Sequence, residues 1–271
     1  MDLEGIIIHK TPFKERDLIC NVLLRSGKKV AIYFYGGRGG GKKTKGSILE
    51  VGFMMKITSA PRRKVVDTNI IIAKEYKHIW NSEYIRDNYK AFYLSSFFME
   101  YIGKIALESN HDEISKDDDS GLFRVLSNSL YFLDDSIKNK NFDLYTHLFI
   151  FLSKLSIELG VVPDVESCLY CGDKLSDEDL CLFNSQDGGF SCIECTSKKD
   201  EFLSENKLLK EEYMGSRLLR LKLKKSYSLP YKSYQEINDI TQGLAISQFN
   251  YLNLQFEFTR DQFKTWAMIS N

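Results

Sequence analysis

The alternation of apolar and polar residues over residues 1–80 predicts a small β domain. The segments DLICNVLL (17–24) and VAIYFY (30–35) each carry apolar side chains at every second position, which is the period of a half-buried strand. Further strands are predicted in EGIIIHK, ILEVGFMMKITS and VVDTNIIIAK. Five short strands with long basic loops favour a small closed barrel such as an OB-fold.

From about residue 81 the apolar spacing changes to the helical period of three to four. Five segments fit an amphipathic helix: NYKAFYLSSFFMEYIGKIAL, LFRVLSNSLYFL, YTHLFIFLSKLSIELG, ENKLLKEEYMGSRLLRLKL and SYQEINDITQGLAISQFNYLNLQF. A four-cysteine segment separates the third from the fourth. The sequence therefore predicts an α+β multidomain protein, with an N-terminal OB-fold β-barrel at 1–80, an α-helical domain at 81–164 and 199–271, and an inserted zinc ribbon at 165–198.

Length, hydropathy and charge limit the function classes. A chain of 271 residues suggests about two domains, and no apolar stretch approaches the roughly 18 residues of a membrane span. The acidic start MDLEG does not resemble a signal peptide, so we expect a soluble cytoplasmic protein without a membrane partner. The net charge of zero hides a split, because residues 1–80 hold 16 Lys/Arg against 7 Asp/Glu.

This basic excess has two possible explanations. It can attract a polyanion, or it can serve the docking of two oppositely charged domains. We favour the polyanion, because the positive charge is concentrated around predicted loops.

The glycine-rich stretch GGRGGGKKTKG (36–46) places backbone close to phosphate. Gly36, Gly41 and Lys42 have the spacing of a P-loop, but Lys43 occupies the position that needs a hydroxyl for Mg²⁺. A P-loop also opens a helix, whereas the residues that follow read as a strand. The pattern therefore favours the phosphates of a nucleic-acid strand over those of a bound nucleotide.

Four of the six cysteines form the pattern C-x₂-C-x₂₀-C-x₂-C, which is typical of a zinc ribbon. The predicted ligands are Cys168, Cys171, Cys192 and Cys195. A hairpin turning at residues 187–189 would bring the two pairs together. Four cysteines close the coordination shell, so we expect a structural Zn²⁺ rather than a catalytic one, and disulfides are disfavoured in a reducing cytosol. The remaining cysteines, Cys20 and Cys181, are expected to pack in the interior.

No catalytic constellation is visible. The four histidines are scattered, and neither H-E-x-x-H nor G-x-S-x-G occurs. We therefore expect a protein that is not an enzyme. The rival classes are a zinc-ribbon nucleic-acid-processing enzyme or divergent ATPase, and a purely structural zinc-ribbon adaptor.

The basic barrel supplies candidate nucleic-acid contacts. Cations beside aromatic residues suit phosphates and stacked bases of a single strand. Two tyrosines share the outward face of one predicted strand, where they either stack on bases or pack under a neighbouring element. The predicted DNA-binding residues are Lys28, Lys29, Tyr33, Tyr35, Arg38, Lys42, Lys43, Lys45, Arg62, Arg63 and Lys64.

The order of these parts resembles the bacterial recombination mediator RecO family. The resemblance rests on the opening EGIIIHKTPFKERDLICNVLLRSGK, on YGGRGGGKKTKGSILEVGF, and on CLYCG with DGGFSCIEC. It covers the chain end to end, although the helical parts are only compatible with it. Two departures matter for the DNA contacts: the loop is longer and richer in glycine than the family's compact basic version, and EVG follows Leu49 where a polar-Pro sequence is more usual.

The resemblance implies a DNA-repair and recombination protein without catalysis, associated with the nucleoid. Such proteins bind single- and double-stranded DNA, anneal complementary strands, and act with RecR to load recombinase on DNA coated by single-strand-binding protein. They also bind the acidic C-terminal tail of that protein through the helical domain. A tail of this kind needs a cation beside an apolar pocket, and our candidates here are Arg124, Arg217 and Arg220.

Overall fold

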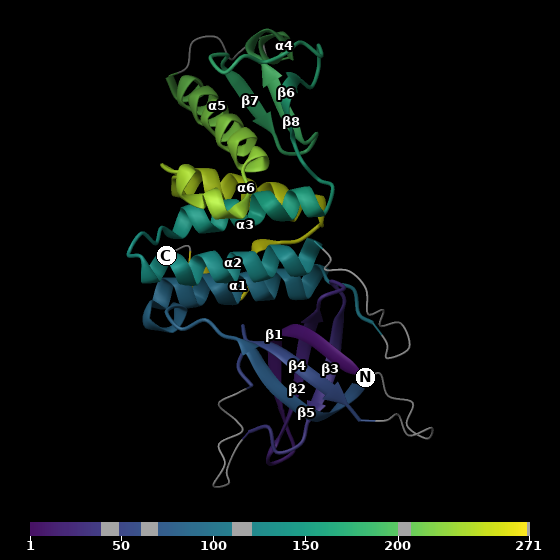
Figure 1. Ribbon diagram of the computed structural model, residues 1–271. Helices are drawn as coiled ribbons and strands as arrows, with labels where there is room; N and C mark the ends of the chain where they lie inside the picture. Colours follow the sequence, from purple (N-terminus) through teal and green to yellow (C-terminus); the bar gives the residue numbers. More distant parts are fainter. Residues whose placement is uncertain (39–48, 61–69, 110–120, 200–206, 270–271) are drawn as a thin grey trace. The chain divides into compact units, whose positions relative to one another are not determined.

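The computed structural model describes residues 1–38, 49–60, 70–109, 121–199 and 207–269, with the side chains of 198–199 and 207–210 excepted (Figure 1). Its packing divides the chain into two compact units, Met1–Phe142 with Phe263–Asn271, and Asp143–Gln262. The predicted boundary at residue 80 separates the barrel from helices that belong to the same first unit. No helix among the described residues is long and apolar enough to cross a membrane.

The first unit is built on a closed five-stranded barrel, as the alternation predicted. The strand order around it is β1-β2-β3-β5-β4, with β3 and β5 parallel and the other pairs antiparallel. This is the order of an OB-fold. The strands are β1 (Asp2–Phe13), β2 (Asp17–Leu24), β3 (Lys29–Phe34), β4 (Met54–Ser59) and β5 (Ile70–Trp80).

The predicted inward faces of β2 and β3 form the barrel core. Cys20, Val22, Ile32 and Phe34 are all fully buried there. One predicted strand is shorter than expected, because β4 begins only at Met54. The residues before it make a turn at 51–52, where glycine adopts a φ of 90° that other residues disfavour.

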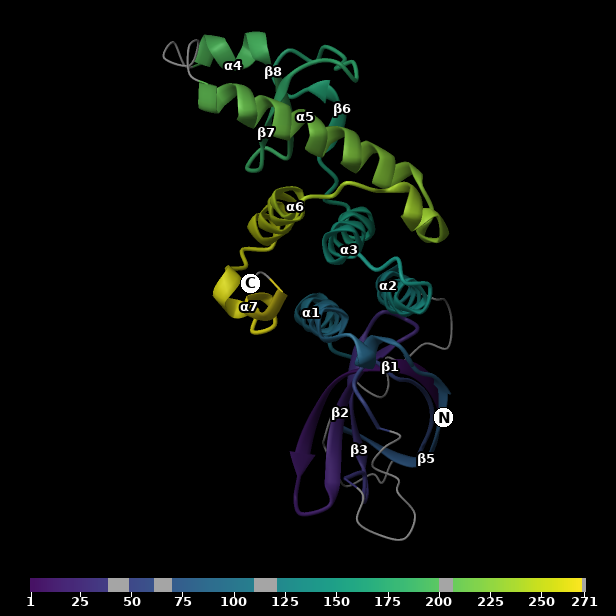
Figure 2. The same cartoon turned by 90° about the vertical axis from the view of Figure 1, so that its left-hand side faces the viewer.

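Helices of the first unit pack against the barrel (Figure 2). The backbone of Lys29 in β3 exchanges hydrogen bonds with the segment after α1, donating to Leu107 O at 2.8 Å and accepting from Ser109 N at 3.0 Å. The guanidinium of Arg25 lies 5.2 Å from the centre of the Phe123 ring. The helical elements are η2 (Ile85–Asp87), α1 (Tyr89–Ile105), α2 (Gly121–Lys138) and α7 (Trp266–Ile269).

The second unit contains helices α3 (Leu144–Glu158), α5 (Lys207–Ser228) and α6 (Gln242–Gln255), with 3-10 turns η4 (Tyr231–Glu236) and η5 (Arg260–Gln262). The long helix predicted at 233–256 is wrong: a 3-10 turn and an irregular segment precede α6. That helix begins after Thr241, whose hydroxyl accepts a hydrogen bond from Leu244 N at 3.4 Å.

The four-cysteine module is a three-stranded sheet followed by a short helix. Its elements are β6 (Asp164–Cys168), β7 (Cys181–Asn184), β8 (Gly189–Cys192) and α4 (Ile193–Lys199), in the sheet order β6-β8-β7. The predicted hairpin is present, but its turn lies at residues 185–188, because Asn184 pairs with Gly189. Helix α5 packs against β6 and β7.

Candidate metal centre and candidate nucleic-acid surface

The module brings the four predicted ligands together. The Sγ atoms of Cys168, Cys171, Cys192 and Cys195 all lie within 4.8 Å of one another, and those of Cys171 and Cys192 are 4.0 Å apart. Tetrahedral Zn²⁺ with Zn–S bonds of about 2.3 Å would place its sulfurs about 3.8 Å apart. The four cysteines can therefore hold a single metal ion of this size.

Backbone geometry prepares Cys168 as a thiolate. Burial acts to raise its pKa, but backbone N–H groups of Cys171, Cys192 and Tyr170 outweigh that effect and lower it to about 6. The turn is closed by Gly172, whose N–H donates to Cys168 O at 3.0 Å and whose φ is 77°. At Cys171 the backbone N–H of Asp173 acts to lower the pKa, but desolvation and the neighbouring thiols of Cys168 and Cys195 outweigh it and raise the pKa to about 12. Without metal, the first knuckle therefore favours the thiolate at Cys168 alone.

The other two cysteines are interior residues, as expected. Cys20 is fully buried in the barrel, and desolvation raises its pKa to about 12. Cys181 is fully buried in β7, and desolvation raises its thiol pKa as well. Neither thiol belongs to the metal-ligand group.

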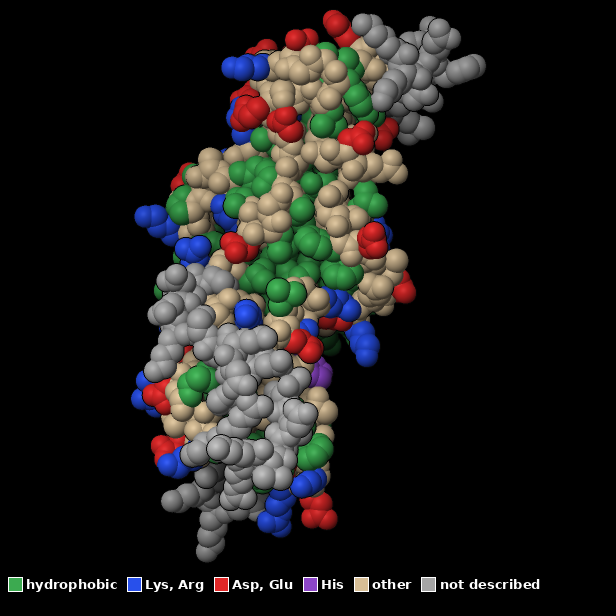
Figure 3. Space-filling model, turned by 90° about the vertical axis from the view of Figure 1, so that its right-hand side faces the viewer, with side chains coloured by type: hydrophobic (Ala, Val, Ile, Leu, Met, Phe, Trp, Pro, Cys, Tyr) green, Lys and Arg blue, Asp and Glu red, His purple; other side chains and the backbone are tan. Residues whose placement is uncertain are grey.

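The surface of the module is strongly acidic (Figure 3). Residues 164–199 contain eight Asp/Glu and three Lys. A Zn²⁺ ion with four thiolates adds a further net charge of about −2. The excess of carboxylates makes this part of the chain a poor match for phosphates.

The buried Arg220 joins helix α5 to the module. It is fully buried, and its Nη1 donates to Val165 O and Leu175 O, both at 3.0 Å, while its Nη2 donates to Ser176 O. The expectation that this residue offers a surface cation to a partner peptide is therefore wrong, because backbone carbonyls of the module occupy its guanidinium.

The other two arginines predicted to bind a partner peptide, Arg217 and Arg124, differ in how accessible their side chains are. The Nε of Arg217 donates to Asp177 O at 2.8 Å. The side chain of Arg124 is exposed on α2, but its apolar neighbours Phe123 and Val125 are buried in the first unit. These two arginines stay predicted partner contacts, and Arg124 is the more accessible of them.

The predicted DNA-binding residues that the structure describes lie at the two ends of β3. At one end, Lys28 is in the β2–β3 turn, and Lys29 Nζ donates to Gly103 O of α1 at 2.8 Å. At the other end, Tyr35 and Arg38 are exposed. The loop and turn cations Lys42, Lys43, Lys45, Arg62, Arg63 and Lys64 lie outside the described residues.

The two tyrosines have different environments. Tyr33 is buried, and its hydroxyl donates to Asp17, which raises the pKa of Tyr33 to about 12 and lowers that of Asp17. Tyr35 is 62% exposed, and its ring meets that of Tyr33 edge-to-face at 4.5 Å. Tyr33 therefore packs and orients Tyr35, which presents its ring to solvent.

Sequence reasoning missed a third aromatic residue of this surface. Phe13 is 41% exposed, and its ring lies 5.5 Å from that of Tyr33. The residue ends β1, beyond the predicted strand EGIIIHK. Extending the period-two alternation to residue 13 would have placed it on the outward face.

Potential metal ligands gather at one place in the described part of the chain. There, the four cysteines form the one group of three or more His, Cys, Asp or Glu ligands that could hold a metal ion. The P-loop alternative falls mostly outside the described residues. Residues 49–59, which follow the loop, form a turn and a strand rather than a helix.

Known proteins resemble this chain in sequence. The family model described as "Recombination protein O C terminal" matches residues 95–242. The chain is 27% identical to a DNA repair protein RecO of Caldanaerobacter subterraneus subsp. tengcongensis over 76% of each chain. It is 28% identical to a DNA repair protein RecO of Thermodesulfovibrio yellowstonii, over 72% of this chain and 69% of the relative. A third DNA repair protein RecO, of Maridesulfovibrio salexigens, is 25% identical over 71% and 72%.

Proposed function

The chain belongs to the RecO family, and from that premise we propose that it mediates recombinational DNA repair by binding and annealing DNA. The observation that carries the proposal is the family match over residues 95–242, together with the closed barrel that precedes it. A role in DNA repair and recombination follows from the family. Annealing, recombinase loading and the named partners are the finer part of the proposal.

Charge supports annealing as the mechanism. Two DNA strands repel each other, and a cationic surface offsets that repulsion while releasing counterions. The basic excess of residues 1–80 supplies such a surface, and the exposed ring of Tyr35 offers a stacking platform. Contacts to phosphates and ring faces leave the choice of partner to base pairing, so nucleotide hydrolysis is not needed.

Zinc is proposed as the ion of the four-cysteine centre. Closely placed thiolates on two knuckles favour it, and a closed shell leaves no position for substrate. Its task would be to hold β6, β8 and α4 together. The acidic surface of the module supports this assignment against a direct contact with DNA.

Two protein partners complete the proposal: RecR, and the acidic tail of single-strand-binding protein. For the tail, Arg124 is the accessible cation, and Arg217 is the alternative. Titration of a tail peptide against Arg124→Ala and Arg217→Ala should weaken binding in at least one variant with an unchanged circular dichroism spectrum. Unaltered affinity in both would place the groove elsewhere.

The annealing experiment tests the central proposal. Purified protein is mixed with complementary oligonucleotides, one of them fluorescently labelled, without ATP and with rising salt. We expect strand pairing to accelerate at low salt and to slow as salt rises. A requirement for ATP would favour the divergent ATPase, cleavage of the strands would favour the processing enzyme, and no DNA binding at all would refute the proposal.

A further inference from the structure

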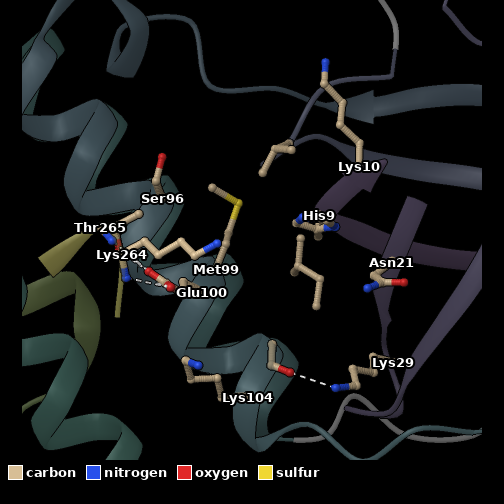
Figure 4. Close-up of a pocket in the computed structure, with 13 residues that line it drawn as sticks. His9, Lys10, Asn21, Lys29, Ser96, Met99, Glu100, Lys104, Lys264 and Thr265 are labelled. Carbon is tan, nitrogen blue, oxygen red and sulfur yellow. Dashed lines mark hydrogen bonds between the residues drawn. The ribbon is translucent and has the colours of Figure 1, made fainter. Parts of the chain in front are cut away.

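A cleft of about 540 Å³ separates the outer face of the barrel from α1 and the start of the C-terminal segment (Figure 4). All of its lining residues belong to the first compact unit. Figure 4 shows His9, Asn21 and Lys29 on the strand side, opposite Met99, Lys104 and Lys264 on the helix side. Among the predicted DNA-binding residues, Lys29 alone lines this cleft, because the four lysines of the cleft come from four separate segments of the chain.

Positive charge dominates the cleft. Four lysines line it with one carboxylate, Glu100. That carboxylate is already occupied, since it accepts hydrogen bonds from Lys264 N at 2.9 Å and Thr265 N at 3.0 Å. The cleft therefore suits an anionic ligand.

Two of the four ammonium groups have protein partners, and two are available. Lys10 pairs with Glu50. Lys29 donates to Gly103 O, and its Nζ also lies 3.6 Å from Glu108 Oε1. Among the residues that the structure describes, neither Lys104 nor Lys264 forms an ion pair. The ammonium of Lys104 lies 5.2 Å from the centre of the Phe263 ring, which leaves its charge unneutralised.

The floor of the cleft is apolar. Ile8 and Met99 are buried, and Val51 is partly buried beside them. A thioether packs well against an aromatic ring. The exposed imidazole of His9 and the amide of Asn21 add a flat ring and hydrogen-bonding groups at the edge. Together they can hold a planar, hydrogen-bonding group such as a nucleobase, with its phosphates at the lysines.

The cleft continues along the barrel as one strip. Period-two alternation places His9, Thr11 and Phe13 on the same outer face of β1. In the neighbouring strand β2, Asn21 pairs with His9 and Ile19 pairs with Thr11. Thr11 and Phe13 are exposed. At about 3.3 Å per residue, the strip runs about 13 Å from the cleft to the aromatic rings of Phe13 and Tyr35.

We propose that a nucleic-acid strand follows this strip, with one unstacked nucleotide in the cleft and its phosphates on Lys104 and Lys264. The inference rests on the proposed DNA-binding function and deepens it by giving the strand a second anchor on α1. An acidic peptide is the less favoured occupant. The strip beyond the cleft ends in the exposed rings of Phe13 and Tyr35, with the ammonium of Lys14 lying 5.6 Å from the centre of the Phe13 ring. Exposed rings beside a cation suit stacked bases and phosphates better than they suit a chain of carboxylates.

The test compares two double variants that remove the same charge from the same unit. Lys104→Ala/Lys264→Ala empties the cleft of its available cations, and Lys90→Ala/Lys138→Ala removes two lysines of α1 and α2 that do not line it. Binding of oligothymidylate is measured over a series of salt concentrations. Because two phosphates lose their cation in the cleft variant, its log–log salt slope should fall by about 1.4, and the control should leave the slope within about 0.3.

A second measurement locates the base. Photocrosslinking with a thio-substituted oligothymidylate, followed by mass spectrometry, should give adducts on peptides containing His9 or Met99. Lys264→Ala alone repeats the salt test without disturbing the contact between Lys104 and Phe263. It should reduce the slope by about 0.7.

Each outcome separates the inference from the proposed function. An unchanged slope in the cleft variants, with DNA binding intact, overturns the inference and leaves the function standing. Loss of binding to an acidic peptide without loss of DNA binding also overturns it, because the occupant is then a protein tail. Absence of DNA binding in the unaltered protein refutes the proposed function itself.

Discussion

Replacing Arg220 tests whether one buried guanidinium joins helix α5 to the metal module. The side chain is fully buried and donates three hydrogen bonds to carbonyl oxygens of Val165, Leu175 and Ser176. The carbonyls belong to β6 and to the segment after the first knuckle. Arg220→Ala would leave these acceptors without their donor and would open a cavity the size of a guanidinium.

The magnitude follows from the three bonds. A hydrogen bond to a charged group contributes about 1.5–3 kcal/mol, so three give a gross loss of roughly 4.5–9 kcal/mol. The variant no longer bears the cost of burying a charge, which is several kcal/mol. Because three buried carbonyl oxygens each lose their donor, at about 1–3 kcal/mol apiece, we expect a net loss of about 3–5 kcal/mol in the free energy of unfolding of the second unit. At a urea m-value of about 2 kcal/mol/M, the midpoint would fall by about 2 M.

The chain offers a matched control on the same helix. Arg217 also donates to a carbonyl of the module, at 2.8 Å from Asp177 O, but this bond is exposed to solvent. Water replaces such a partner, so Arg217→Ala should cost no more than about 1 kcal/mol. The loss of stability in Arg220→Lys should lie between those of the two alanine variants, since an ammonium cannot reach all three carbonyls at once.

Urea unfolding followed by circular dichroism, with metal release read in parallel by a chromogenic indicator, distinguishes the variants. Metal release follows the module itself, whereas circular dichroism is dominated by the helices. Equal midpoints for the two alanine variants, or a shift below about 0.5 M for Arg220→Ala, would refute the reasoning. The guanidinium would then contribute packing alone.

Three further predictions concern the metal, the loop and a buried histidine. Cys192→Ser/Cys195→Ser should abolish zinc binding and destabilise the module, whereas elemental analysis that finds no zinc in the unaltered protein would contradict the assignment. Replacing the three lysines of residues 42–45 by alanine should weaken binding to DNA of any sequence. The log–log salt slope should fall by about 0.7 for each phosphate left without its cation. If the variant lost affinity for ATP and not for DNA, the P-loop interpretation would be favoured again. Burial lowers the pKa of His147 from 6.5 to about 4. The free energy of unfolding contributed by the neutral imidazole is therefore fully present above pH 6.5 and should be about 2 kcal/mol lower at about pH 5. His147→Gln should remove this pH dependence in urea titrations.

Much of the fold could be read from the sequence because it depends on local periodicity. Cys20 and Phe34 are buried where the alternation places them, and the cysteine spacing identifies four sulfurs that do lie together. Periodicity could not show where a helix stops. The apolar pattern of 233–256 continues through residues that form a 3-10 turn, and the cap at Thr241 is a weak signal within it.

The site was harder to predict because its interactions join distant segments. Arg220 reads as a surface cation on a leucine-rich helix, and only the packing of α5 on the module shows that it is buried. The hydroxyl of Tyr33 is taken by Asp17, which lies 16 positions away. Likewise, Lys104 and Lys264 are far apart in the sequence, and only the folded structure shows that both line the same cleft.

The division of charge separates the metal's role from DNA binding. Residues 164–199 carry eight acidic side chains against three lysines, whereas residues 1–80 carry 16 Lys/Arg against 7 Asp/Glu. Counterion release requires cations near phosphate, so the excess of carboxylates makes the module a poor source of it. Loss of zinc should therefore lower stability while the salt slope of DNA binding stays constant, and removal of the loop lysines should do the reverse. A salt slope that falls on zinc removal would mean that the module orders the DNA-binding surface.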